Sequence, residues 1–136
     1  MKRSEIRSAQ ARALDYFGKA GIILTDAEMA NVEVADFGLN DLESQGLEIL
    51  TYVNTDRCCA KELVLFPYQA CPEHFHPPVE GDPGKEETFR CRWGEVFLYV
   101  DGLDTGKPSV RPPSVWCKVR HEVRLAPGDQ FTLRPG

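Results

Sequence analysis

The sequence predicts a mainly β fold, an antiparallel sandwich or barrel of jelly-roll type that follows N-terminal helices. After Gly46 the chain is rich in Val, Leu, Phe, Tyr and Thr, in short runs separated by turn residues, which is typical of such folds. Before residue 36, apolar residues recur at helical spacing. No repeat, low-complexity tract or linker divides the 136 residues. We therefore expect a single domain over residues 1–136, with a helical segment at 1–35 and a partial β-barrel at 47–136 that is incomplete at its C-terminus.

Two helices are predicted in the N-terminal segment. Residues 4–18 form an amphipathic pattern in which Ser4 can cap the helix and Gly18 can end it. The apolar positions at helical spacing are Ile6, Ala9, Ala13 and Phe17. Thr25 and Glu28 make a capping-box pattern, which predicts a second, short helix.

The strand-rich part begins after Gly46. The predicted strands are 47–53, 58–66, 87–100, 115–119 and 131–133. Gly94 interrupts the long run at 87–100, which indicates a tight turn or bulge between two strands.

Composition and charge exclude several classes of protein. The chain has 16 Lys and Arg against 21 Asp and Glu, a net charge of -5, so we expect neither nucleic-acid binding nor attraction to an anionic membrane. The N-terminus lacks the apolar core of a signal peptide, and no run approaches the roughly 18 apolar residues of a membrane span. The five cysteines include no C-x-x-C pair. We therefore expect a cytoplasmic protein with reduced thiols.

Two histidines and a glutamate form a candidate metal site. If residues 71–77 are a strand, alternation places His74 and His76 on the same face, with Cα atoms roughly 6.6 Å apart. A loop at 77–86, rich in Pro and Gly, then leads to Glu87 in the next extended run. Two imidazoles and a carboxylate suit Mn, Fe, Ni or Zn. The alternative is that these histidines are ordinary polar residues beside a loop.

At these residues the sequence resembles the cupin superfamily, whose first motif is G-x5-H-x-H-x3-4-E-x6-G. His74, His76, Glu87 and Gly94 match it, and the spacing to Gly94 favours Glu87 over the preceding glutamate. Two departures are visible. Tyr68 stands where the motif has its first glycine, and the loop before Glu87 has ten residues.

The resemblance is closest to the D-lyxose isomerase group of cupins, over roughly residues 38–135. The segments that match this group are residues 54–63 (Asn-Thr-Asp-Arg-Cys-Cys-Ala-Lys-Glu-Leu), 71–77 (Cys-Pro-Glu-His-x-His-Pro) and 84–96 (Gly-Lys-Glu-Glu-Thr-Phe-Arg-x-Arg-Trp-Gly-Glu-Val). This resemblance implies an aldose–ketose isomerase that converts D-lyxose, a small sugar, to D-xylulose. It also implies a homodimer and a divalent ion, Mn²⁺ first, with Zn²⁺, Fe²⁺, Ni²⁺ and Co²⁺ as alternatives.

Lysines supply the candidate contacts to a sugar. Lys85 lies two residues before Glu87 and corresponds to the lysine of the group's Lys-x-Glu element, so we expect both to be catalytic, with Lys85 also binding substrate. The alternative is a solvated loop lysine. Lys61 alternates with Leu63 and Leu65, so it is either a substrate-binding lysine in the barrel or an edge-strand lysine.

Glu73 immediately precedes His74. Alternation directs its side chain away from the metal, so we interpret it as structural.

The second cupin motif, G-x5-P-x-G-x2-H-x3-N, supplies a further histidine. Residues 128–136 resemble the beginning of this motif, and the sequence ends at Gly136, before the histidine. We therefore expect a C-terminally truncated chain with weaker metal binding than a complete site, and association or poor solubility through its open side. Two other functions remain open: a non-catalytic cupin module that binds metal or sugar, and a different cupin enzyme such as an iron oxygenase.

Overall fold

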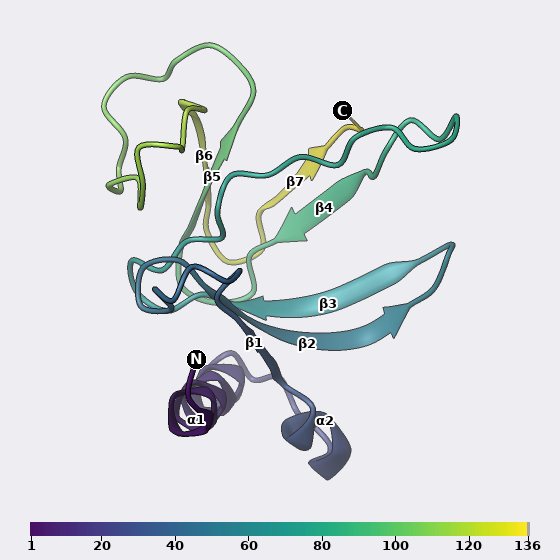
Figure 1. Cartoon of the computed structure of the whole chain (residues 1–136), viewed down its shortest axis with the longest axis vertical. Coiled ribbons are helices and arrows are strands. Elements are labelled where there is room, and N and C mark those ends of the chain that lie inside the picture. The colour runs from purple at the N-terminus through teal and green to yellow at the C-terminus, as the bar shows by residue number, and fades with distance from the viewer. Residues whose placement is uncertain (136) are drawn as a thin grey trace. The chain divides into compact units, whose positions relative to one another are not determined.

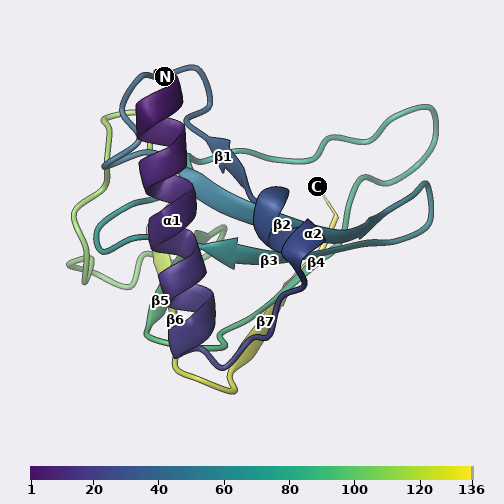
Figure 2. The same ribbon diagram turned by 90° about the horizontal axis from the view of Figure 1, so that it is seen from below.

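The computed structural model describes residues 1–135 (Figures 1 and 2). The elements in chain order are α1 (Arg3–Lys19), α2 (Asp26–Ala30), β1 (Glu33–Ala35), β2 (Leu47–Asn54), β3 (Cys59–Val64), β4 (Glu87–Arg90), β5 (Val96–Val100), β6 (His121–Leu125) and β7 (Gln130–Leu133). The predicted mainly β fold with N-terminal helices is confirmed. Within the described residues the strands form three separate sheets rather than one closed barrel.

Residue contacts divide the chain into two compact units, Met1–Pro72 and Glu73–Gly136. Each unit has its own sheets, with β1, β2 and β3 in the first unit and β4 to β7 in the second. The assignment of all 136 residues to one domain stays a prediction. No helix in the described part of the chain is long and apolar enough to cross a membrane.

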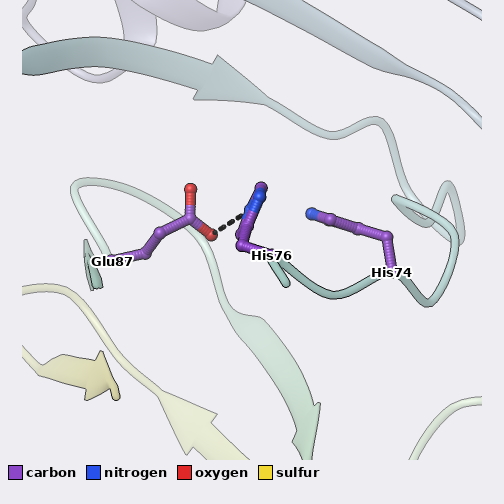
Figure 3. A group of neighbouring side chains, drawn as sticks. All are labelled: His74, His76 and Glu87. Atoms are coloured by element: carbon purple, nitrogen blue, oxygen red, sulfur yellow. Dashed lines mark ion pairs between the residues drawn. The ribbon is translucent and has the colours of Figure 1, made fainter. Parts of the chain in front are cut away.

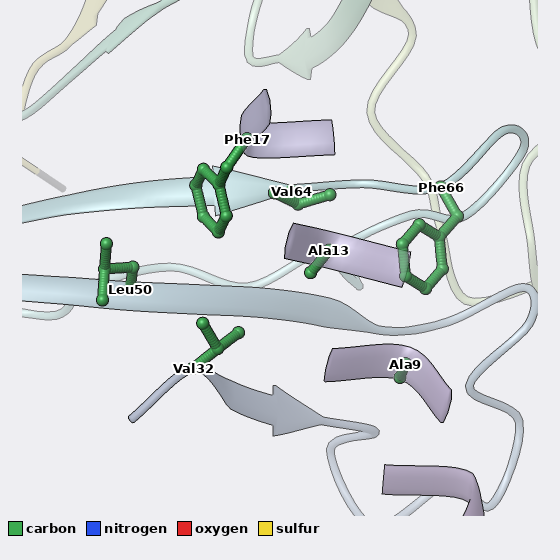
Figure 4. Packing of buried hydrophobic residues seen from close by; sticks show 7 residues of the cluster. All are labelled: Ala9, Ala13, Phe17, Val32, Leu50, Val64 and Phe66. Atoms are coloured by element: carbon green, nitrogen blue, oxygen red, sulfur yellow. The ribbon is translucent and has the colours of Figure 1, made fainter. Parts of the chain in front are cut away.

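The first unit packs α1 against an antiparallel sheet in the order β1-β2-β3 (Figure 2). Ala9, Ala13 and Phe17 recur every four residues, so they lie on one side of α1 and are buried. They meet side chains of the sheet and its flanking segments in one apolar cluster (Figure 4), completed by Val32, Leu50, Val64 and Phe66. The predicted amphipathic helix is therefore confirmed.

The ends of the two helices differ in how well the sequence predicts them. The capping box of α2 is confirmed, because the Thr25 Oγ1 accepts the Glu28 N–H at 3.3 Å and the Glu28 carboxylate accepts the Thr25 N–H at 2.8 Å. The prediction that Ser4 caps α1 is wrong, since Lys2 is the N-cap and its N–H donates to the carboxylate of Glu5. Gly18 also lies inside α1 rather than at its end.

The second unit contains two antiparallel strand pairs, β4 with β7 and β5 with β6. The predicted break at Gly94 is confirmed, because β4 ends at Arg90, β5 begins at Val96, and Gly94 has a φ of 76°. The predicted strand at 115–119 is wrong. Its apolar side chains Val115 and Trp116 are 85% and 76% exposed, so the alternation there does not correspond to a buried face.

Two strands, β1 and β6, were not predicted from the sequence. The strand β6 begins at His121, two residues after the predicted strand ends, and β1 has three residues only. Both begin with a polar residue and are too short to show a clear apolar alternation, and pairing with a neighbouring strand makes them extended.

Candidate metal centre

The two histidines lie in a segment without regular secondary structure. Residues 71–78 belong to no strand, so the prediction that His74 and His76 alternate along a strand is wrong. The physical reason is the neighbouring proline content: Pro72 and Pro77 have no N–H to donate to a β-ladder. The loop, rather than a pleated strand, must therefore bring the two imidazoles together.

The imidazoles and the glutamate nevertheless converge (Figure 3). One ligand atom from each of His74, His76 and Glu87 lies within 4.8 Å of the other two. The two rings meet edge to face, with centroids 5.1 Å apart. The Nε2 of His76 lies 3.4 Å from the Oε2 of Glu87. These atoms surround a point that a single cation can occupy.

A buried nitrogen tests whether a cation fits there. The Nε2 of His76 is shielded from solvent and has no hydrogen-bond partner among residues 1–135, although the carboxylate of Glu87 faces it. Leaving such an atom without a partner costs about 1–3 kcal/mol. A divalent ion would satisfy this nitrogen, and the set of two imidazoles and one carboxylate is one that first-row metals accept. The residues present therefore fit a divalent metal ion.

Backbone turns in the ten-residue loop return the chain to His76. Val79 and Asp82 exchange two backbone hydrogen bonds, of 3.1 and 2.8 Å, and so close a tight turn. Gly84 then passes so close to the backbone carbonyl of His76 that an added Cβ would collide with that oxygen, and its φ is 99°. Glycine is the residue that tolerates both conditions. This close approach sets Glu87, three residues later, beside the histidines.

Strand pairing between β4 and β7 also fixes the position of Glu87. Glu87 is the first residue of β4 and pairs with Leu133 of β7, and the hydroxyls of Thr88 and Thr132 are hydrogen-bonded at 2.8 Å in the next pair. The carboxylate is thus carried by a paired strand, while the histidines are carried by a loop.

Charges around Glu87 keep it ionised. Burial is the largest single influence and raises its pKa, but the hydrogen bond and charge of Lys85, together with the nearby His76 and His74, outweigh it. The net result is a pKa of Glu87 below its ordinary value. The Oε1 of Glu87 accepts a hydrogen bond from the Lys85 ammonium, and its Oε2 faces His76. The two oxygens therefore interact with different partners.

The structure brings four of the five predicted site residues together: His74, His76, Lys85 and Glu87. The fifth, Lys61, lies on β3 in the first unit and is exposed. Lys61 is therefore not a buried cation in this structure. Its predicted contact with substrate stays a prediction. Of the predicted second motif, Gly136 lies outside the described residues.

The sequence did not single out Gly84, and it led us to interpret Glu73 as structural without showing what its side chain contacts. The Asp-Pro-Gly wording at 82–84 is a turn signal that could have drawn attention to Gly84. Glu73 offers no comparable signal, because its hydrogen-bond partners lie 45 and 46 residues away.

Comparison with characterised proteins adds close relatives over the whole chain. The D-lyxose ketol-isomerase of Cohnella laeviribosi is 56% identical over 139 residues, which cover 100% of this chain and 76% of that protein. The D-lyxose/D-mannose isomerase of Thermosediminibacter oceani is 55% identical, covering 99% and 76%. The D-lyxose ketol-isomerase of a Thermofilum species is 52% identical, covering 96% and 74%. No model of a protein family matches the chain.

Proposed function

The chain belongs to the D-lyxose isomerase family, and we propose that it is a metal-dependent isomerase that interconverts D-lyxose and D-xylulose. The observation that carries the proposal is the convergence of His74, His76 and Glu87, within 4.8 Å, on a chain so similar to isomerases. In this proposal these three residues hold the ion. The alternative of a module that binds metal or sugar without turnover is not favoured, since the relatives are enzymes.

The reaction moves a proton between C1 and C2 of the sugar, and negative charge develops on the neighbouring oxygens. A bound divalent ion supplies Lewis-acid stabilisation of those oxygens. The Oε1 of Glu87 holds the Lys85 ammonium, and its Oε2, which faces His76, would be available to the ion, so one carboxylate would hold both cationic groups. The Lys85 side chain is 45% exposed, which leaves its ammonium free to donate a hydrogen bond to the oxygen that gains charge.

The finer features are also proposals. We take Mn²⁺ as the ion, with Zn²⁺, Fe²⁺, Ni²⁺ and Co²⁺ as the alternatives that the same donor atoms accept. Because one relative is named a D-lyxose/D-mannose isomerase, D-mannose is the second sugar to test. We also propose a homodimer, supported by large apolar side chains that the second unit exposes, including Phe75 at 74% and Trp116 at 76%. A cytoplasmic location stays a prediction.

The test is ketose formation by the chain after its metal has been removed and replaced. We expect D-xylulose to form from D-lyxose with Mn²⁺, to disappear with chelator, and to be lost in His76→Ala and Glu87→Gln. Lys85→Met should lower kcat by about 100-fold while it still binds the ion. Glu80→Gln, which changes an exposed carboxylate in the same loop, is the matched control and should behave as wild type.

The outcomes separate the candidate functions. Stoichiometric metal binding without ketose from either sugar would overturn the isomerase proposal in favour of a non-catalytic module. Undiminished turnover by His76→Ala would overturn the proposed ligand set.

A further inference from the structure

We propose that Glu73 is a positioning residue for the metal centre, because it fastens the backbone next to His74 to the segment Lys118–Val119. This inference rests on the proposed function only in that it takes His74, His76 and Glu87 to bind a divalent ion. Glu73 itself is not among the residues whose ligand atoms converge, so it acts through His74 and does not bind the ion.

The carboxylate of Glu73 makes two hydrogen bonds to backbone groups far away in the sequence. Its Oε2 accepts the N–H of Lys118 at 2.5 Å and the N–H of Val119 at 3.1 Å. A carboxylate that accepts backbone N–H groups forms charge-assisted bonds, which are roughly twice as strong as neutral ones. Both bonds end on the same oxygen, so one side chain holds two consecutive peptide groups.

The ligand loop needs such an attachment. The histidines lie in residues 71–78, which no β-ladder holds, whereas Glu87 stands on β4 and is held by β7. The pairing of β4 therefore fixes one of the three donors and leaves the two imidazoles to the loop. Glu73 is directly bonded to His74 along the chain, so restraining its side chain restrains the residue that carries the first imidazole.

The segment that Glu73 bonds is itself well held. The Arg120 guanidinium donates to the carbonyl oxygens of Cys117 and Val119, at 2.7 and 2.9 Å. Immediately afterwards the chain enters β6, which pairs with β5 from His121 to Leu125. Glu73 thus ties a loop that belongs to no strand to a segment that leads directly into a strand pair.

The expected consequence concerns metal affinity. Removing a group that orients a metal ligand typically costs 10–100-fold in affinity, because the ligand must then be ordered when the ion binds. Glu73→Ala should raise the Kd for Mn²⁺ by about tenfold. Glu73→Gln keeps an oxygen that can accept both N–H groups and should stay within about threefold of wild type. Once saturated with the ion, Glu73→Ala should regain most of its kcat.

The experiment measures Mn²⁺ binding to the metal-free chain without sugar, and in parallel the hydrogen exchange of the Lys118 and Val119 amides by NMR. Glu80→Ala is the matched control, an exposed carboxylate in the loop between His76 and Glu87. We expect Glu73→Ala alone to speed exchange at these two amides and to weaken binding, with a thermal midpoint of the metal-free chain close to that of the control.

Several results would overturn the inference. An unchanged Kd in Glu73→Ala would do so, as would a loss of affinity equal to that of Glu80→Ala. If Glu73→Ala does not fold, Glu73→Asp replaces it, since its shorter side chain cannot reach both amides; wild-type affinity there would count equally against the role. A wild-type chain that binds Mn²⁺ but forms no ketose would overturn the proposed function and leave the role of Glu73 standing.

Discussion

Glu48, on β2, is a carboxylate that the proposed reaction does not use and that solvent does not reach. Its side chain is fully buried, its Oε2 has no hydrogen-bond partner in the described part of the chain, and its Oε1 lies 3.4 Å from the amide of Gln69. Burial raises the pKa of Glu48 to about 7, and the hydrogen bond from Gln69 and the charge of Arg12 offset only part of that rise. Below about pH 7 the folded protein therefore favours the protonated form of Glu48.

This residue predicts a pH dependence of stability. Because the pKa of Glu48 is higher in the folded state than its ordinary value of 4.5, the folded state binds more protons between those two pH values. The free energy of unfolding should therefore fall as the pH rises from about 4.5 to about 7, by at most about 3 kcal/mol from this group. Urea unfolding across that range measures it. Glu48→Gln should lack this fall and be the more stable protein at pH 8.

The comparison between wild type and Glu48→Gln isolates the effect. Glu28, Asp41 and Glu122 have lowered pKa values through their hydrogen bonds, so they act in the opposite direction and at lower pH. They are present in both proteins and cancel in the difference. If the free energies of unfolding of the two proteins ran parallel across this pH range, Glu48 would have the same pKa in the folded and the unfolded state, and the prediction would be wrong.

At the scale of elements, the ten-residue loop between His76 and Glu87 matters most, because its path decides where the carboxylate arrives. Gly84 and Gly81 both have positive φ angles, 99° and 89°, but only Gly84 lies against another part of the backbone. An added Cβ at Gly84 would strike the carbonyl oxygen of His76, whereas one at Gly81 would meet open space. Alanine substitutions at the two glycines therefore distinguish the effect of backbone strain, which both would cause, from that of a steric collision, which only Gly84→Ala would cause.

We expect Gly84→Ala to weaken Mn²⁺ binding by about tenfold or more, because the loop must move away from His76 and take Glu87 with it. Gly81→Ala carries a similar φ penalty, of about 1 kcal/mol, and should leave the affinity nearly unchanged. Calorimetric titration of both metal-free variants measures the difference. Equal losses in the two would mean that φ strain, not the approach to His76, controls the site.

At the scale of the whole molecule, the proposed metal ligands and the buried apolar cluster belong to different units. His74, His76 and Glu87 lie in Glu73–Gly136, and the cluster around Phe17 and Leu50 lies in Met1–Pro72. A ligand that binds one folded unit stabilises that unit by mass action and opposes its local opening.

Saturating Mn²⁺ should therefore slow amide exchange in β4 and β7 more than in α1 and β2. Hydrogen exchange followed by mass spectrometry, with and without chelator, measures this, and His76→Ala should show no response to the ion. Equal protection of both units would instead indicate that the chain opens as one cooperative domain, as the sequence analysis predicts.

By itself the sequence determined the features that depend on short spacings. The helix around residues 4–18, the capping box at Thr25 and the break at Gly94 follow from periodicity or turn chemistry within a few residues, whereas His74, His76 and Glu87 were chosen through the resemblance to the cupin motif. Local propensity and side-chain chemistry are enough for these, because few alternatives compete with them.

Only the tertiary structure decided the rest. Prolines keep the histidine segment out of any sheet, and contacts with distant residues then give it its shape: Gly84 against His76, and Glu73 on Lys118 and Val119. The exposure of Lys61 and the strand at His121 likewise depend on which surfaces are covered and which strands pair. Such contacts join residues that are far apart along the chain, and no local pattern records them.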